Sequence, residues 1–397
     1  MTKKIISIYD TTLRDGAQTV GISFSLQDKL NIAKILDWLK IDYIEGGWPG
    51  PNPKDEAFFS EVRKLDIQHS KIAAFGSTKR KGLSCKEDPM MQSLVNSKAD
   101  VITLVAKSWD FQVTKALGME LHENLELIYD SVAYLKDLGF TVFLDAEHFF
   151  DGYKSNSDYS LSCLAKACEA GVDMLVLCDT NGGTLPSEVF DITRDVTSKF
   201  STAVGGHFHN DSGVAVANSM YAIDAGAVSI QGTINGYGER CGNCDLITFI
   251  PNSALKMGYH CSSAEVLQHL TEVSRMVSEI ANLPHRENMP YAGDNAFAHK
   301  GGIHVSALQK DTRTYEHIDP SLVGNRRKVL ISELSGKSNV EFKAKELGID
   351  ITGDINLSRT ILEKIKNLEE QGFQFEAAEA SFELIIREAT GEYKPFF

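Results

Sequence analysis

A chain of 397 residues is too long for one ordinary domain and has room for one large domain with an appendage. Apolar residues make up 43% of it, enough for a substantial core, and its formal net charge of −14 argues against nucleic acid or an anionic membrane as a partner. No stretch reaches the roughly 18 uncharged apolar residues of a membrane-spanning helix. The N-terminus lacks the apolar core of a signal peptide, and the 7 scattered cysteines are typical of a reduced, cytoplasmic protein.

Residues 1–260 alternate between short apolar runs and amphipathic helical patterns. The helical patterns include residues 26–39, 120–138 and 158–170, and the apolar runs are typical of parallel strands covered on both faces. These runs lie at residues 5–9, 43–46, 72–75, 101–106, 141–144, 174–177, 204–208 and 229–234. Eight such units in about 250 residues predict a TIM (β/α)8 barrel. A doubly wound open sheet is the alternative, but it normally has a glycine-rich turn after its first strand, where this chain has DTTLRDG.

Polar residues fall at the C-terminal ends of the predicted strands, where barrel enzymes place their chemistry. They are Arg14 and Asp15, Glu45, Asp145 and Glu147, Asp179 and Thr180, His207, His209 and Asn210, and Asn235. This agreement among separate segments is the main support that the sequence gives to the barrel.

His207 and His209 stand one residue apart at the end of the seventh predicted strand. Residues i and i+2 of a strand point to the same side, so both imidazoles can reach one divalent ion, with Asp15 as a third ligand at the barrel mouth. This mixed set does not select between Mg, Mn, Co and Zn, and it leaves open positions for a chelating 2-oxo acid, whose ketone the ion would polarise. The alternative is two histidines that are separately hydrogen-bonded.

Other motifs have two interpretations each. Arg14 suits an oxyanion that develops on a ketone, or a structural ion pair with Glu45, and both can hold. Residues 77–82, STKRKG, could attract the phosphates of a nucleotide-bearing substrate, although a solvated loop is favoured. His304, in a glycine-flanked segment, could move protons near neutral pH or be structural, and Tyr315 is similarly ambiguous.

The strand–helix alternation stops after about residue 260. Helical patterns follow at residues 263–281, 339–347 and 357–370. We predict that residues 261–397 form a mostly helical appendage, which covers an active-site mouth in its own subunit or in a neighbour.

Three motifs together resemble those of the DRE-TIM metallolyases, a family that includes 2-isopropylmalate and homocitrate synthases. They are DTTLRDGAQ at residues 10–18, the pair His207 and His209, and GYGERCGN at residues 236–243. Further segments look most like the branch of this family that acts on pyruvate. They are IEGGWPG at residues 44–50, DAEHFFDG at 145–152, LCDTNGG at 177–183 and FAHKGGIH at 297–304.

The resemblance implies an acyltransferase that performs a Claisen-type condensation. Acetyl-CoA attacks the ketone of a metal-bound 2-oxo acid, and hydrolysis of the thioester then releases CoA. The resemblance implies Asp15, His207 and His209 as the metal ligands, with Asn243 at or near the metal.

The same resemblance assigns the remaining roles. Arg14 polarises the ketone, with Glu45 completing the signature, and Thr180 contacts the carboxylate of the keto acid. Glu147 is the carboxylate of the catalytic centre on the fifth strand. His304, accompanied by Tyr315, is brought by the appendage into a partner's site, which implies a homodimer.

Pyruvate carries only a methyl group beside its ketone, so its pocket should be small and apolar. Leu104, on the fourth predicted strand, is expected to help close this pocket. Asp145 does not suit such a pocket and could hydrogen-bond a neighbour instead.

Three alternatives stay open. The nearest is a sister synthase that acts on 2-oxoisovalerate or 2-oxoglutarate. The second is an acyl-CoA lyase, which would use a cysteine in a glycine-rich loop comparable to that of Cys241, although the context of Arg240 and Asn243 fits the synthases better. The third is a non-catalytic, metal-stabilised barrel.

Family members often carry a C-terminal regulatory domain that binds an end-product amino acid. We expect this domain to be absent here, and we therefore expect no feedback inhibition by isoleucine.

Overall fold

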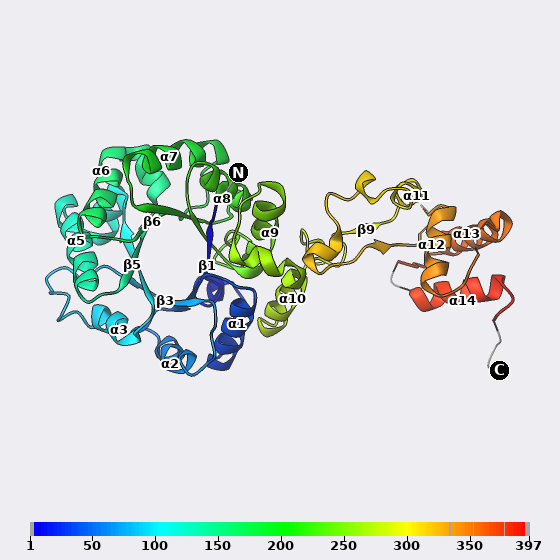
Figure 1. The fold of residues 1–397 in the computed structure, drawn as a ribbon, viewed down its shortest axis with the longest axis horizontal. Coiled ribbons are helices and arrows are strands. Elements are labelled where there is room, and N and C mark those ends of the chain that lie inside the picture. Colours follow the sequence, from blue (N-terminus) through cyan, green and yellow to red (C-terminus); the bar gives the residue numbers. More distant parts are fainter. Residues whose placement is uncertain (1–3, 333–334, 352, 377, 394–397) are drawn as a thin grey trace. The chain divides into compact units, whose positions relative to one another are not determined.

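The structure is a computed structural model that describes residues 4–332, 335–351, 353–376 and 378–393. It divides into two compact units, Met1–His285 and Arg286–Phe397. Within the first unit, Figure 1 shows strands arranged in a ring with helices around them.

Strands β1 to β8 of the first unit form a closed parallel barrel in which successive strands are neighbours, and β8 closes on β1. This confirms the predicted TIM barrel. The strands are β1 (Ser7–Asp10), β2 (Tyr43–Gly47), β3 (Lys71–Ser77), β4 (Val101–Lys107), β5 (Thr141–Glu147), β6 (Met174–Asp179), β7 (Ala203–Phe208) and β8 (Ser229–Gly232). Strands β5 and β6 extend past the predicted apolar runs, because polar residues at their C-terminal ends continue the ladder.

The helices between these strands cover the outside of the barrel (Figure 1). They are α1 (Leu26–Trp38), α2 (Pro53–Val62), α3 (Pro89–Ser97), α4 (Asp110–Gln112), α5 (Leu121–Asp137), α6 (Phe149–Glu169), α7 (Pro186–Lys199) and α8 (Ala215–Asp224). Their starts follow local sequence signals: Ser25 and Asp28 form a capping box at α1, and Pro186 opens α7 as predicted. Helix α6 is longer than predicted and has a non-helical residue at Asn156.

The interior of the barrel is apolar at its N-terminal end. Tyr9, Val101, Phe143 and Val176 belong to one buried cluster drawn from β1, β4, β5 and β6. Because side chains alternate along each strand, the next inward positions toward the C-terminal ends carry the polar groups. The apolar cluster therefore fills the barrel interior on the N-terminal side of the polar site.

The first unit continues past the eighth strand. Helices α9 (Leu246–Pro251) and α10 (Leu270–Ile280) follow, and α10 contacts both α1 and α9. Asn235, after β8, donates its Nδ2 to the carbonyl of Ser274 on α10 at 2.9 Å. The unit therefore ends at His285 rather than at the expected residue 260, because the buried face of α10 packs on barrel helices.

The second unit is mostly helical. It contains α11 (Gly302–Leu308), α12 (Lys337–Glu346), α13 (Ile355–Glu370) and α14 (Glu379–Ala389), with two short parallel strands, β9 (Ala298–His299) and β10 (Lys328–Val329). Its apolar core includes Val340, Ile361, Ile365, Phe382 and Ile386. Helices α12 and α13 match the predicted patterns, whereas α11 and α14 were not predicted. Among the described residues, no helix is both long enough and apolar enough to cross a bilayer.

Candidate active site and metal centre

Asp15, His207 and His209 converge in one buried group at the C-terminal end of the barrel. Nε2 of His207 lies 3.3 Å from Oδ2 of Asp15 and 3.3 Å from Nε2 of His209, and His209 Nε2 lies 4.0 Å from Oδ2 of Asp15. Ligands bound at about 2.1 Å in tetrahedral directions are about 3.4 Å apart. The three atoms therefore have the spacing of ligands to a single ion.

Two separate segments of the backbone carry these three side chains. His207 lies on β7, His209 follows that strand and bridges to Asn243, and Asp15 sits in the turn after β1. Gly206 precedes His207, and a Cβ there would come within 2.5 Å of the Phe208 ring. The tight packing around β7 thus needs glycine beside the first histidine.

Asn243 touches the same group, as predicted. Its Nδ2 donates to Oδ2 of Asp15 at 2.8 Å. Its Oδ1 and Nδ1 of His209 are buried without a hydrogen-bond partner among the described residues. A buried acceptor without a partner is unfavourable, and a cation bound beside Asn243 would satisfy its Oδ1, so the residues present fit a metal ion.

The surroundings of Asp15 and of His209 shift the pKa values of these two groups for different reasons. Burial opposes ionisation of Asp15, but Arg14 and His207 outweigh it and hold the Asp15 pKa well below its usual range. Burial and then the neighbouring His207 lower the pKa of His209 to about 3. His209 is therefore a neutral imidazole at physiological pH, as a metal ligand must be.

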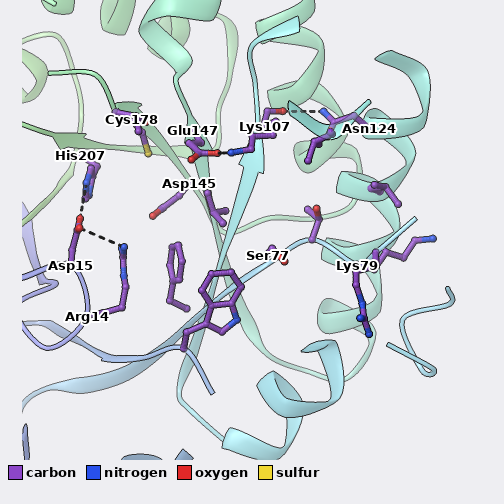
Figure 2. Close-up of a pocket in the computed structure, with 18 of the residues that line it drawn as sticks. Arg14, Asp15, Ser77, Lys79, Lys107, Asn124, Asp145, Glu147, Cys178 and His207 are labelled. Atoms are coloured by element: carbon purple, nitrogen blue, oxygen red, sulfur yellow. Dashed lines mark hydrogen bonds and ion pairs between the residues drawn. The ribbon is translucent and has the colours of Figure 1, made fainter. Parts of the chain in front are cut away.

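Arg14 is held beside the metal group by a buried acid. Its Nε donates to Oε1 of Glu45 at 2.5 Å, and Oε2 of Glu45 accepts from the hydroxyl of Tyr9 at 2.8 Å. Its guanidinium carbon lies 3.9 Å from the centre of the Phe75 ring, and its Nη1 lies 3.7 Å from Asp15. Figure 2 shows Arg14 directed at Asp15. The predicted ion pair with Glu45 is confirmed, and it leaves the outer edge of the guanidinium facing the metal group.

A cavity of about 560 Å³ opens over these residues. The predicted site residues that line it are Arg14, Asp15, Glu147, Thr180, His207 and His209. Glu147 pairs with Lys107, whose backbone carbonyl accepts from Nδ2 of Asn124 (Figure 2). The hydroxyl of Thr180 accepts from the backbone N–H of His148 at 2.9 Å.

Leu104, which was expected to help close the substrate pocket, does not line the cavity. Val105, the next residue of β4, lines the cavity, and successive strand residues point to opposite faces. Leu104 is fully buried on the outer face of the barrel, among the covering helices. The apolar run at residues 101–106 did not reveal which alternate positions face inward.

Asp145 does hydrogen-bond a neighbour, which was the alternative considered for it. Its Oδ1 accepts from Nε2 of Gln231 on β8 at 2.9 Å. Burial, followed by the charge of Glu45, raises the pKa of Asp145 to about 7.

The basic segment after β3 also lines the cavity, through Lys79, Arg80 and Lys81. Each of these cations has an acidic partner. Lys79 pairs with Asp130 at 3.1 Å, Arg80 with Asp88 at 3.2 Å, and Lys81 with Glu123 at 2.7 Å. The segment is therefore at the cavity, but its charge is largely balanced by neighbouring carboxylates.

His304 and Tyr315 belong to the second unit, whereas the cavity is lined by the first. Their rings stack with centroids 4.1 Å apart, and Tyr315 is 45% exposed. The two residues that the resemblance associates thus form one accessible pair.

Sequence reasoning did not single out Val105, Lys107, Asn124 or Gln231. Gln231 had a visible signal, since it is a polar residue within the apolar run at residues 229–234. The other three could not be separated from ordinary strand and helix residues without the barrel register.

Family models cover most of the chain. The model described as HMGL-like matches residues 5–277, and the model described as homocitrate synthase post-HMGL domain-like matches residues 292–372. The chain belongs to the HMGL-like family. The two matches fall on either side of the division between the two units.

Curated relatives refine this assignment. An (R)-citramalate synthase from Aquifex aeolicus is 52% identical over 100% of this chain and 75% of its own length. A 2-isopropylmalate synthase from Methanocaldococcus jannaschii is 32% identical over 98% of this chain and 72% of its own length. The solved structure of an HMG-CoA lyase from Brucella melitensis is 16% identical, with a TM-score of 0.59 over 70% of this chain and 99% of that one, and shows the shared fold.

Proposed function

We propose that this protein is an acyltransferase that condenses acetyl-CoA with pyruvate to give (R)-citramalate and CoA, for isoleucine biosynthesis by the threonine-independent route. The observation that carries the proposal is the buried group of Asp15, His207 and His209, which opens on the same cavity as Arg14 and Thr180. It occurs in a chain 52% identical to an (R)-citramalate synthase over its full length.

The reaction joins the two substrates through a new carbon–carbon bond. The methyl group of acetyl-CoA loses a proton, its carbon bonds to the ketone carbon of pyruvate, and the ketone oxygen gains a proton. Water then cleaves the thioester, so that CoA leaves as a thiol and the acetyl carbon becomes a carboxylate.

A divalent ion, Mg, Mn, Co or Zn, held by Asp15, His207 and His209 with Asn243 beside them, would supply Lewis-acid polarisation of the ketone. Arg14 is fixed by Glu45 so that its remaining N–H groups can donate to the oxygen as negative charge develops on it. We assign Thr180, which lines the same cavity, as a hydrogen-bond donor to the pyruvate carboxylate.

Glu147 and its partner Lys107 lie farther along the cavity wall (Figure 2). We assign Glu147 as a carboxylate of the catalytic centre, with Lys107 holding its orientation. Val105, next to this pair on β4, supplies an apolar surface suited to the methyl group of pyruvate.

The enzyme is proposed to act as a homodimer in which His304 and Tyr315 enter the site of the partner subunit. The stacked, accessible ring pair supports this role. Mixing inactive His304→Ala and His207→Ala subunits should restore activity, since each mixed dimer contains one intact site. Activity no higher than that of the separate variants would rule out a shared site.

Rates with a panel of 2-oxo acids test the reaction. We expect CoA release from acetyl-CoA to be fastest with pyruvate and to vanish when a chelator removes the metal. A preference for 2-oxoisovalerate would instead indicate a 2-isopropylmalate synthase, which is the name of the relative that is 32% identical. A preference for 2-oxoglutarate would indicate a homocitrate synthase.

The lyase alternative has its own test. Cys241 is exposed in the segment after β8. Cys241→Ser should leave synthase activity largely intact, and near-total loss would favour lyase chemistry. We place the enzyme in the cytoplasm, which agrees with free thiols at each of the seven cysteines, all of which lie in the described part of the chain.

A further inference from the structure

We propose that Gln231 is a positioning residue of the metal centre, which fixes the tautomer and the ring orientation of His207 and is itself held by Asp145. The proposal rests on the proposed metal site at Asp15, His207 and His209. Gln231 lies on β8 and is 2% exposed, and Asp145 lies on β5 and is 3% exposed. Strand β8 pairs with β7 and β1, so the link to β5 crosses the interior of the barrel.

The hydrogen bonds form a directed chain. Nε2 of Gln231 lies 2.9 Å from Oδ1 of Asp145, and Oε1 of Gln231 lies 2.8 Å from Nδ1 of His207. At this contact the amide nitrogen of Gln231 donates and the carboxyl oxygen of Asp145 accepts. The amide oxygen then faces His207 and only accepts, so Nδ1 of His207 carries the hydrogen.

In the neutral imidazole that a metal ion requires, this assignment leaves Nε2 of His207 with a free lone pair. The same Nε2 is the atom that lies 3.3 Å from Asp15 and 3.3 Å from His209 Nε2. The hydrogen bonds from His207 to Gln231 and from Gln231 to Asp145 thus leave Nε2 of His207, beside Asp15, available to bind a cation. Such outer partners of metal-bound histidines fix the ring and raise the basicity of the ligand.

His209 provides an internal contrast. Its Nδ1 is buried and has no hydrogen-bond partner within the described ranges of the chain. Its ring therefore lacks the support that Gln231 gives to His207. The orientation of the imidazole pair consequently depends on the His207 side of the site.

Metal affinity measured on the full chain by competition with a chelator, with Co²⁺ and Zn²⁺ as probes, tests the role. Gln231→Leu keeps a similar side-chain size but removes both hydrogen bonds, and should weaken metal binding by about 10-fold to 100-fold. The visible absorption of bound Co²⁺ should change as well. Ser229→Ala is the matched control, because Ser229 lies two residues earlier on β8, is buried, and has an Oγ without a partner in the described structure.

A swapped pair separates positioning from simple packing. In the double variant Asp145→Asn with Gln231→Glu, the amide of residue 145 donates to the carboxylate of residue 231, which still accepts from His207. Its metal affinity should recover toward that of the wild type. A double variant that binds no better than Gln231→Leu, or a Gln231→Leu variant with wild-type affinity, overturns the proposal.

His207→Ala keeps this test distinct from that of the proposed function. If His207→Ala binds metal as tightly as the wild type, the metal site itself is wrong and the proposed chemistry fails with it. If His207→Ala loses affinity while Gln231→Leu does not, only the positioning role of Gln231 is overturned.

Discussion

The candidate site of the first unit is built from buried charges, whereas the helical core of the second unit is apolar. In the first unit, Asp15, Glu45 and Asp145 are at most 3% exposed, and each has a hydrogen-bond partner within the barrel. In the second unit, the core between α12, α13 and α14 is apolar and includes Ile361 and Ile365, which are fully buried. Its candidate functional pair, His304 and Tyr315, is accessible.

The difference follows from what each architecture can enclose. A closed barrel brings many strand ends to one place, so buried charges find partners there. A few packed helices offer fewer such partners, and they are stabilised by apolar burial. The first unit therefore holds a preorganised polar site, while the second presents residues from its surface.

Arg14→Lys tests whether the polar site is preorganised, and it should give the largest effect. Lysine keeps the positive charge near the buried Glu45, but it cannot both hold that acid and donate toward the metal group. We expect the catalytic rate to fall by about 10³-fold, while thermal unfolding changes little. Steady-state kinetics and calorimetry check both; near-normal turnover would remove Arg14 from the chemistry.

Ile361→Ala tests the apolar core of the second unit. Truncating this fully buried side chain should lower the free energy of unfolding of that unit by about 3 kcal/mol. Ile355→Ala on the same helix is the control, because Ile355 is 59% exposed. Denaturant titration should show a loss for Ile361→Ala alone, and equal losses in the two variants would contradict the proposed core.

Val105→Ala and Leu104→Ala distinguish the two faces of β4. Removing methyl groups at Val105 enlarges the cavity, so the preference for pyruvate over 2-oxobutanoate should fall by about tenfold. Leu104→Ala should lower stability but leave this preference unchanged. The ratio of kcat/KM for the two acids is the measurement, and a shift caused by Leu104→Ala would reverse the assignment of faces.

Asp10 should give the smallest of these effects, a pH dependence of the free energy of unfolding. Burial raises its pKa from 3.8 to about 7, so the folded chain holds the proton more tightly than the unfolded chain. The stability that this group contributes is fully present below pH 3.8 and is lost as the pH rises through about 7. A group of this kind changes the free energy of unfolding by about 1 kcal/mol between pH 6 and pH 8.

Asp10→Asn should remove this component of the pH dependence, because asparagine does not titrate. Free energies of unfolding at pH 6 and pH 8, from denaturant titrations of both proteins, provide the comparison. An identical slope in the two proteins would show that Asp10 does not titrate in this range.

The sequence by itself determined the barrel and the metal group. Strand and helix periods repeat along the first unit, and the His207 and His209 pair is local, so both features are visible without a fold. Asp15 could be added because the first and seventh strands of a closed parallel barrel end at the same rim.

The tertiary structure decided what depends on register and on distant partners. Leu104 and Val105 are consecutive residues, yet Val105 lines the cavity and Leu104 points to the outer face. The hydrogen bond between Gln231 and Asp145 joins β8 to β5, two strands that are far apart in the chain and are not paired in the sheet. The position of α10 with the barrel likewise depends on packing against α1 and α9, which local sequence patterns do not encode.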